Sequence, residues 1–174
     1  MNVNIRPETT ADYPAVRKVN LAAFDTATEA DLADAMREAP EYVPELSLVA
    51  ELDGKIVGHA LFSEVTVVQE RGELRALSLG PIAVLPDYQR RGIGSAMIEH
   101  GHRRGRELGY PFVVLIGHPW YYPRFGYVPA REHGLITIWD VSDPVFMVCE
   151  LESGALEHAA GEIQYPEPFV RLGG

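Results

Sequence analysis

The stretch RALSLGPIAVLPDYQRRGIGSAMIEHGHRRGRELG, residues 75–109, determines the expected fold. Its first part, 75–85, is apolar and predicts a strand, and 92–108 predicts a helix that ends at Gly109 with Pro111 just beyond. The apolar run FVVLIG, 112–117, then predicts a buried strand. A strand–helix–strand unit of this kind is a crossover between two parallel strands, so the sequence predicts an α/β sheet with helices packed on it.

The remaining chain adds mostly strands to this unit. The alternating run at 46–68 turns at Asp53-Gly54, which is a strong hairpin signal. We expect a mixed, mostly antiparallel sheet in a single domain spanning residues 1–174. Further expected elements are a strand at 2–7, a helix at 9–24 opened by a capping box of Thr9 and Asp12, a helix at 29–39, a short helix or turn at 120–127 and a strand at 145–151.

Composition narrows the function classes. The 174 residues hold 25 acids and 15 Lys or Arg, a net charge of −10, which argues against a general nucleic-acid binder. The one cysteine, Cys149, allows no internal disulfide, and we expect it to be a core residue. With no signal-like start and no run long enough to span a membrane, the expected location is the cytoplasm.

The loop before the predicted helix suits an anionic ligand. Gly92 and Gly94 let a ligand approach the backbone, and the helix N-terminus offers unpaired N–H groups. Arg90 and Arg91 could add charge-assisted contacts. The loop lacks the Lys-Ser/Thr pair of a P-loop, and Met97 stands where the dinucleotide fingerprint needs a third glycine. ATP binding therefore fits poorly, and a tight helix entry with surface arginines stays an alternative.

Gly80-Pro81 interrupts the preceding strand, and such a pair is typical of a bulge or of a strand that leaves its neighbour. The backbone amides of Ile82, Ala83 and Val84 would then be open to an extended ligand that carries its own amides. Pantetheine, joined to a pyrophosphate in coenzyme A, is such a ligand. The strand and the glycine loop together indicate coenzyme A.

The segment QRRGIG, 89–94, matches the Q/R-x-x-G-x-G/A signature of the GCN5-related N-acetyltransferases (GNAT), and it follows an apolar strand and opens a long helix as in that family. GHPWYYPRFGY, 117–127, and Tyr165-Pro166 resemble a bacterial branch with a YYxxFG segment. The resemblance implies a GNAT fold, a central mixed sheet flanked by about four helices. It also implies an acetyl-CoA-dependent N-acetyltransferase that needs no metal and acetylates a primary amine by direct attack in a ternary complex.

The resemblance assigns roles to individual residues. Tyr122 would be the general acid for the leaving thiolate, while Tyr121 would point elsewhere. The acceptor would be a small-molecule amine or a peptide amine, and a homodimer is possible by family analogy. The residues expected to bind the cofactor are Ile82, Ala83, Val84, Gln89, Arg90, Arg91, Gly92, Ile93, Gly94 and Ser95.

Several features leave alternatives open. Neither Glu64 nor Ser78 can be assigned as a general base, so a non-catalytic acyl-CoA-binding module remains an alternative. His118 could titrate in the site, although capping or packing is the simpler interpretation. Seven acids between Phe24 and Glu45 could attract a cationic acceptor at the lip of its site, or form an ordinary solvated face. Gly101 and Gly105 are expected to serve helix packing.

Overall fold

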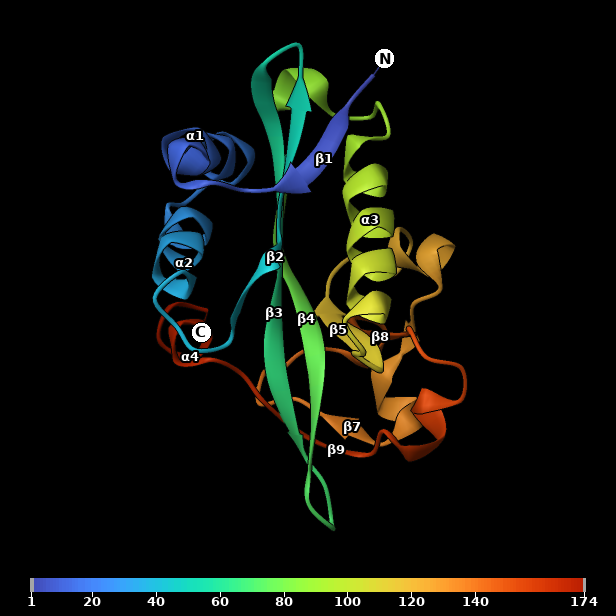
Figure 1. Ribbon diagram of the computed structural model, residues 1–174. Helices are drawn as coiled ribbons and strands as arrows, with labels where there is room; N and C mark the ends of the chain where they lie inside the picture. Colours follow the sequence, from blue (N-terminus) through green and yellow to red (C-terminus); the bar gives the residue numbers. More distant parts are fainter. Residues whose placement is uncertain (1, 174) are drawn as a thin grey trace.

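The computed structural model describes residues 2–173, and within them nine strands form one mixed sheet (Figure 1). The main path runs β1-β2-β3-β4-β5-β8-β6, with β9 paired to β3 and β7. Two of the strand pairings, β4–β5 and β7–β9, are parallel and the others are antiparallel. This confirms the mixed, mostly antiparallel sheet. The strands are β1 (Asn4–Pro7), β2 (Tyr42–Leu52), β3 (Lys55–Val68), β4 (Glu73–Val84), β5 (Phe112–Ile116), β6 (Val128–Pro129), β7 (Leu135–Ile136), β8 (Phe146–Glu150) and β9 (Gly161–Gln164).

Four α-helices cover the sheet among the described residues: α1 (Tyr13–Ala23), α2 (Thr28–Met36), α3 (Ile93–Glu107) and α4 (Glu167–Leu172). Helices α1 and α2 lie on one face and α3 on the other, while α4 packs beside α2 (Figure 1). Helix α3 is the crossover between the parallel strands β4 and β5, as predicted. Leu108 is its C-cap and Gly109 follows with a φ of +90°.

Local turn chemistry sets the ends of several elements. Asp53 and Gly54 join β2 to β3 with φ values of +52° and +77°, the left-handed pair that a two-residue hairpin turn requires. The carboxylate of Asp12 accepts a 2.8 Å hydrogen bond from the backbone N–H of Thr9, which confirms the capping box. The helix expected at 29–39 ends earlier, at Met36. The sequence does not predict the short elements β6, β7, β9 and α4.

Helix α3 carries no side chain at two of its contact points with the sheet. A Cβ on Gly101 would lie 2.1 Å from Cε2 of Phe62, and one on Gly105 would lie 3.0 Å from Cδ1 of Leu77. Both glycines are buried. The expectation that they serve packing is confirmed, since the sheet side chains occupy the space that a Cβ would need.

A buried polar network ties the C-terminal end of α2 to the edge of the sheet. The carboxylate of Glu8, with a side chain only 1% exposed, pairs with Arg37 at 2.9 Å and accepts hydrogen bonds from Tyr42 and Ser47. Burial works to raise the pKa of Glu8, but these hydrogen bonds outweigh it and hold the pKa below its usual value. His59, fully buried, lies 3.2 Å from the Ser47 hydroxyl. The network fixes α2 relative to β2 and β3.

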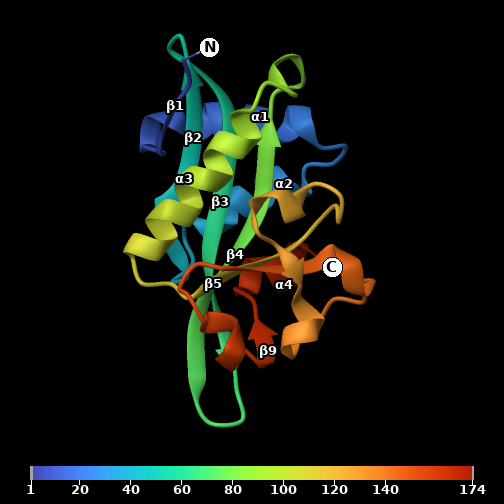
Figure 2. The ribbon, with the colours of Figure 1, turned by 90° about the vertical axis from the view of Figure 1, so that its right-hand side faces the viewer.

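Strands β4 and β5 pair over a short distance only. Their parallel register joins Leu77 to Val113 and Ser78 to Val114, and it stops there. Beyond Gly80, β4 keeps β3 as its neighbour while the chain after β5 turns away to lie near the start of α3 (Figure 2). The second half of β4 therefore has one open edge, as the Gly80-Pro81 pair predicted.

Replacing Gly101 with alanine tests the close packing of α3. The new Cβ would force Phe62 or the helix to move, and overpacking of this kind costs about 1–3 kcal/mol. Gly94→Ala is the matched control, because the nearest atom to its Cβ is the Tyr121 hydroxyl at 3.5 Å. Urea unfolding should show a lower free energy of unfolding for Gly101→Ala only. Equal stability of the two variants would contradict the packing account.

Two buried histidines predict a loss of stability in mild acid. Burial lowers the pKa of both His59 and His102 to about 4, whereas the unfolded chain protonates near its ordinary value of about 6.5. The unfolded state thus binds more protons between pH 6.5 and 4, so stability falls as the pH falls. Between pH 7 and 5 each histidine should cost about 2 kcal/mol of unfolding free energy.

Urea unfolding at both pH values measures this loss. The variants His59→Gln and His102→Gln should each remove about half of the pH dependence, whatever their stability at pH 7. A wild-type free energy of unfolding that stays constant from pH 7 to 5 would show that the two imidazoles are not held neutral.

Candidate functional site

A groove of about 680 Å³ runs between the open edge of β4 and the start of α3. Nine of the ten residues expected to bind the cofactor line it, and so does Tyr122. The nine are Ile82, Ala83, Val84, Gln89, Arg90, Gly92, Ile93, Gly94 and Ser95. Segments that are separate in the sequence therefore meet at one surface, which we call the groove.

The backbone of β4 offers two donors to the groove. The N–H of Leu85 donates to the carbonyl of Val57 in β3 at 2.9 Å. Because N–H groups alternate between the two edges of a strand, those of Ile82 and Val84 point to the open edge, and that of Ala83 points to β3. The expectation that the Ala83 amide is also open to the ligand is therefore wrong. The carbonyl of Val84 is already occupied, since it accepts a 3.0 Å hydrogen bond from Gln89. This bond ties the loop to the strand.

The loop 89–92 presents the N-terminus of α3 to the groove. Arg90 and Gly92 have φ values of +63° and +82°, and nothing lies within 4 Å of the place where a Cβ of Gly92 would stand. The first helical hydrogen bond runs from Ala96 N–H to the Gly92 carbonyl, at 3.0 Å. The N–H groups of the three preceding residues, 93–95, thus have no partner within the helix. This arrangement suits an anion.

Arg91 lies outside the groove. It lines a neighbouring hollow together with Lys55 and Asp53, and its guanidinium lies 5.5 Å from the ring centroid of Tyr88. Lys55 lies 5.4 Å from the same centroid. The Arg91 side chain could therefore reach only a part of a ligand that extends beyond the groove.

Two tyrosines stand at the end of the groove. The ring of Tyr122 lies against Gly117, where a Cβ would be 2.5 Å from its Cε2, and makes an edge contact with Tyr127 at 5.7 Å between centroids. Burial, and to a smaller extent Tyr121, raises the pKa of Tyr122 to about 12. Tyr122 is therefore a neutral hydrogen-bond donor over the whole physiological range.

The expectation that Tyr121 points elsewhere is wrong. Tyr121 also lines the groove, and its hydroxyl lies near Gly94 at the start of α3. The segment is a single turn of 3-10 helix, Tyr122–Phe125, and Tyr121 precedes it as the N-cap. The two rings stand perpendicular, with centroids 5.0 Å apart. The angular spacing of side chains along an α-helix does not apply to a residue that precedes a single 3-10 turn. The neighbouring side chains of Tyr121 and Tyr122 can therefore both face the groove.

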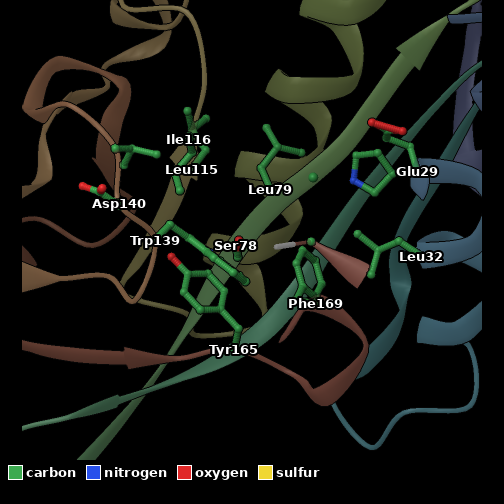
Figure 3. A pocket seen from close by; sticks show the side chains of 14 residues that line it. Glu29, Leu32, Ser78, Leu79, Leu115, Ile116, Trp139, Asp140, Tyr165 and Phe169 are labelled. Carbon is green, nitrogen blue, oxygen red and sulfur yellow. The ribbon is translucent and has the colours of Figure 1, made fainter. Parts of the chain in front are cut away.

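A second cavity, of about 570 Å³, lies beside residues Ser78 to Pro81 of β4, and we call it the apolar pocket. Figure 3 shows Glu29 and Leu32 on one side and Trp139 and Asp140 on the other, with Leu79 between them. The groove begins at Ile82, so the two cavities flank consecutive residues of the same strand. A ligand in the groove and a ligand in the apolar pocket would meet at the point where β4 separates from β5.

The other predicted residues have simpler roles or lie elsewhere. Glu64 accepts a 2.6 Å hydrogen bond from Tyr110 and lines neither cavity, whereas Ser78 lines the apolar pocket. His118 stacks on Trp120 at the groove with 5.1 Å between centroids. Cys149 is buried, which confirms a core residue, and burial raises its thiol pKa to about 11.

Three of the seven acids in the segment between Phe24 and Glu45 pair with arginines. Asp31 and Asp34 contact Arg17, Asp34 also contacts Arg37, and Glu45 contacts Arg104. One acid differs from these: the Oε2 atom of Glu29 is buried and has no hydrogen-bond partner. The sequence alone does not set Glu29 apart from the other acids, because only the folded structure distinguishes a pocket carboxylate from a surface one.

Two general properties concern the part of the chain that the structure describes. None of the helices within residues 2–173 combines the length and the apolar character needed to cross a bilayer. In the same range, no three His, Cys, Asp or Glu side chains gather in a way that could hold a metal ion.

Known proteins resemble the chain over most of its length. The family model of the acetyltransferase (GNAT) domain matches residues 4–130. The uncharacterized N-acetyltransferase YhbS of Escherichia coli is 33% identical to this chain. The match covers 97% of this chain and 99% of the length of YhbS. The uncharacterized N-acetyltransferase YjhQ of the same species is 39% identical over 69% of this chain and 66% of its own.

Solved structures agree with the sequence relatives. The crystal structure of YhbS from Escherichia coli in complex with CoA superimposes with a TM-score of 0.91 at 31% identity, covering 98% of this chain and 93% of the other. A GNAT family acetyltransferase from Brucella melitensis in complex with acetyl-CoA gives a TM-score of 0.78 at 30% identity, covering 97% and 98%.

Proposed function

Since the chain belongs to the family of GNAT acetyltransferases, we propose that it transfers an acetyl group from acetyl-CoA to a primary amine in a ternary complex. One observation carries this proposal: the open backbone edge of β4, the N-terminus of α3 and the neutral Tyr122 all line a single groove. The relatives that were solved with CoA or acetyl-CoA support the choice of ligand.

In this proposal the groove holds acetyl-CoA in an extended form. The N–H groups of Ile82 and Val84 pair with the pantetheine amides as an added strand would. The free N–H groups of residues 93–95 and the positive end of α3 hold the pyrophosphate. Gly92 keeps its backbone accessible because no Cβ covers it. Arg91 and Lys55, in the hollow beside the loop, could add positive charge for a phosphate at the nucleotide end.

The thioester then lies near Tyr122. The lone pair of the neutral amine forms a C–N bond with the thioester carbonyl carbon, and the C–S bond of the resulting tetrahedral intermediate breaks. Tyr122 donates its proton to the leaving sulfur, the new amide nitrogen loses a proton to solvent, and solvent returns a proton to the phenolate. Because the pKa of Tyr122 is about 12, its hydroxyl keeps the proton that it donates over the whole physiological range.

The acceptor amine binds in the apolar pocket and reaches the thioester from there, at the point where β4 separates from β5. Family membership disfavours a non-catalytic acyl-CoA-binding module. In such a module the Tyr122 hydroxyl would have no function. A P-loop binds phosphates with a lysine, and no lysine is among the described residues that line the groove, so ATP is not the proposed ligand.

Removing the Tyr122 hydroxyl tests the proposed reaction. Thiol release from acetyl-CoA, followed with a panel of primary amines, should depend on the amine and should fall roughly 100-fold or more in kcat in Tyr122→Phe. The KM for acetyl-CoA should change little. Because the Tyr122 pKa is about 12, the wild-type kcat should not decline on the alkaline side up to about pH 10.

The matched control is Tyr121→Phe, which removes the neighbouring hydroxyl in the same groove. It should lower kcat by no more than a few-fold. If Tyr121→Phe abolished turnover and Tyr122→Phe did not, the assignment of the proton donor would be wrong. Tight acetyl-CoA binding with no turnover of any primary amine would instead favour the binding module.

A further inference from the structure

The apolar pocket has the size and shape of a small-molecule site. Its volume of about 570 Å³ falls within the usual range for small ligands. Helix α2 and the C-terminal α4 form one side of it, and residues 139–141 form the other (Figure 3). The pocket reaches β4 at the point where β4 and β5 separate, so its occupant can approach the groove.

Three aromatic rings form a continuous wall of this pocket. The centroids of Trp139 and Tyr165 lie 5.6 Å apart, and those of Tyr165 and Phe169 lie 6.2 Å apart. The Tyr165 hydroxyl is hydrogen-bonded to Oγ1 of Thr137 at 2.8 Å, so this ring turns its apolar body rather than its polar tip to the pocket. Leu32 and Leu115 extend the apolar lining. Such a wall suits an aromatic ring or a branched apolar group.

The charged groups at the pocket are acidic. Glu29 belongs to the first turn of α2, and its buried Oε2 atom has no hydrogen-bond partner. Asp140 lies exposed at the opposite side. No Lys, Arg or His is among the described residues that line the pocket. A buried carboxylate oxygen without a donor is costly, and an ammonium group supplies the missing donor.

The position of Glu29 is fixed by the helix that carries it. Arg37, directly after α2, pairs with the buried Glu8, and Arg17 of α1 pairs with Asp31 and Asp34 of α2. These ion pairs hold α2 in place, and with it the backbone that carries Glu29 at the pocket.

We propose that the acceptor is an arylalkylamine, a primary amine joined by a short aliphatic linker to an aromatic ring, and that Glu29 binds its ammonium group. This ammonium group loses one proton to solvent before the neutral amine attacks the thioester. This inference rests on the proposed acetyl transfer and names the class of acceptor. The ring stacks along Trp139, Tyr165 and Phe169. Free amino acids are disfavoured because their carboxylate meets Glu29 and Asp140, and polyamines are disfavoured because their second charge meets the apolar wall.

Direct binding tests the inference separately from turnover. Calorimetry on the protein saturated with CoA should show that phenethylamine binds at least about 10-fold more tightly than spermidine or L-phenylalanine. Glu29→Gln should weaken phenethylamine binding roughly 10-fold or more, as expected for the loss of a charge-assisted hydrogen bond. Glu38→Gln is the matched control, since Glu38 is exposed, follows the same helix and does not line the pocket, and it should bind like the wild type.

The outcomes separate the two claims. Equal binding of phenethylamine by Glu29→Gln and Glu38→Gln, or tighter binding of spermidine or L-phenylalanine, would overturn the arylalkylamine assignment. If those other amines were acetylated in preference, acetyl transfer would stand and only the acceptor class would be wrong. If phenethylamine bound as expected but no amine were acetylated, the proposed transfer would fail, and with it the role of phenethylamine as acceptor.

Discussion

The site depends on the point where β4 stops pairing with β5. Two residue pairs, Leu77 with Val113 and Ser78 with Val114, hold the parallel strands together, and the next residues of β4 have a neighbour on one side only. Unpaired backbone N–H and C=O groups at the edge of a sheet can form hydrogen bonds with a further strand. Here the open edge faces a groove, and the separation also makes room for the apolar pocket on the other side of Gly80-Pro81.

The rest of the molecule holds this opening in place. Gly101 and Gly105 allow α3 to lie against Phe62 and Leu77, which brings the N-terminus of α3 to the open edge of β4. On the other face, the pairing of Glu8 with Arg37 fixes α2 and with it Glu29. The groove and the pocket thus depend on packing far from either cavity, since the position of each helix is set where it meets the sheet.

Much of this arrangement could be predicted from the sequence. Asp53-Gly54, Gly109 and the pair Thr9 and Asp12 mark element ends by their own local chemistry, and the loop 89–94 identifies the groove. The missed strands β6, β7 and β9 are two to four residues long, too short to show a period. Tyr121 lines the groove because its segment is a single 3-10 turn, to which the spacing of a longer helix does not apply. The buried carboxylate oxygen of Glu29 depends on contacts between segments that are distant in the sequence, and a local sequence pattern cannot predict such contacts.

The measurement that tests the central claim most directly is residue-resolved amide hydrogen exchange with and without acetyl-CoA. The alternation along β4 predicts that the amides of Ile82 and Val84 become slower to exchange when the ligand binds, while that of Ala83, directed to β3, does not change. The amides at the start of α3, residues 93–95, should slow as well. Protection of Ala83 alone, or binding that leaves both segments unchanged, would contradict a ligand held along the open edge of β4.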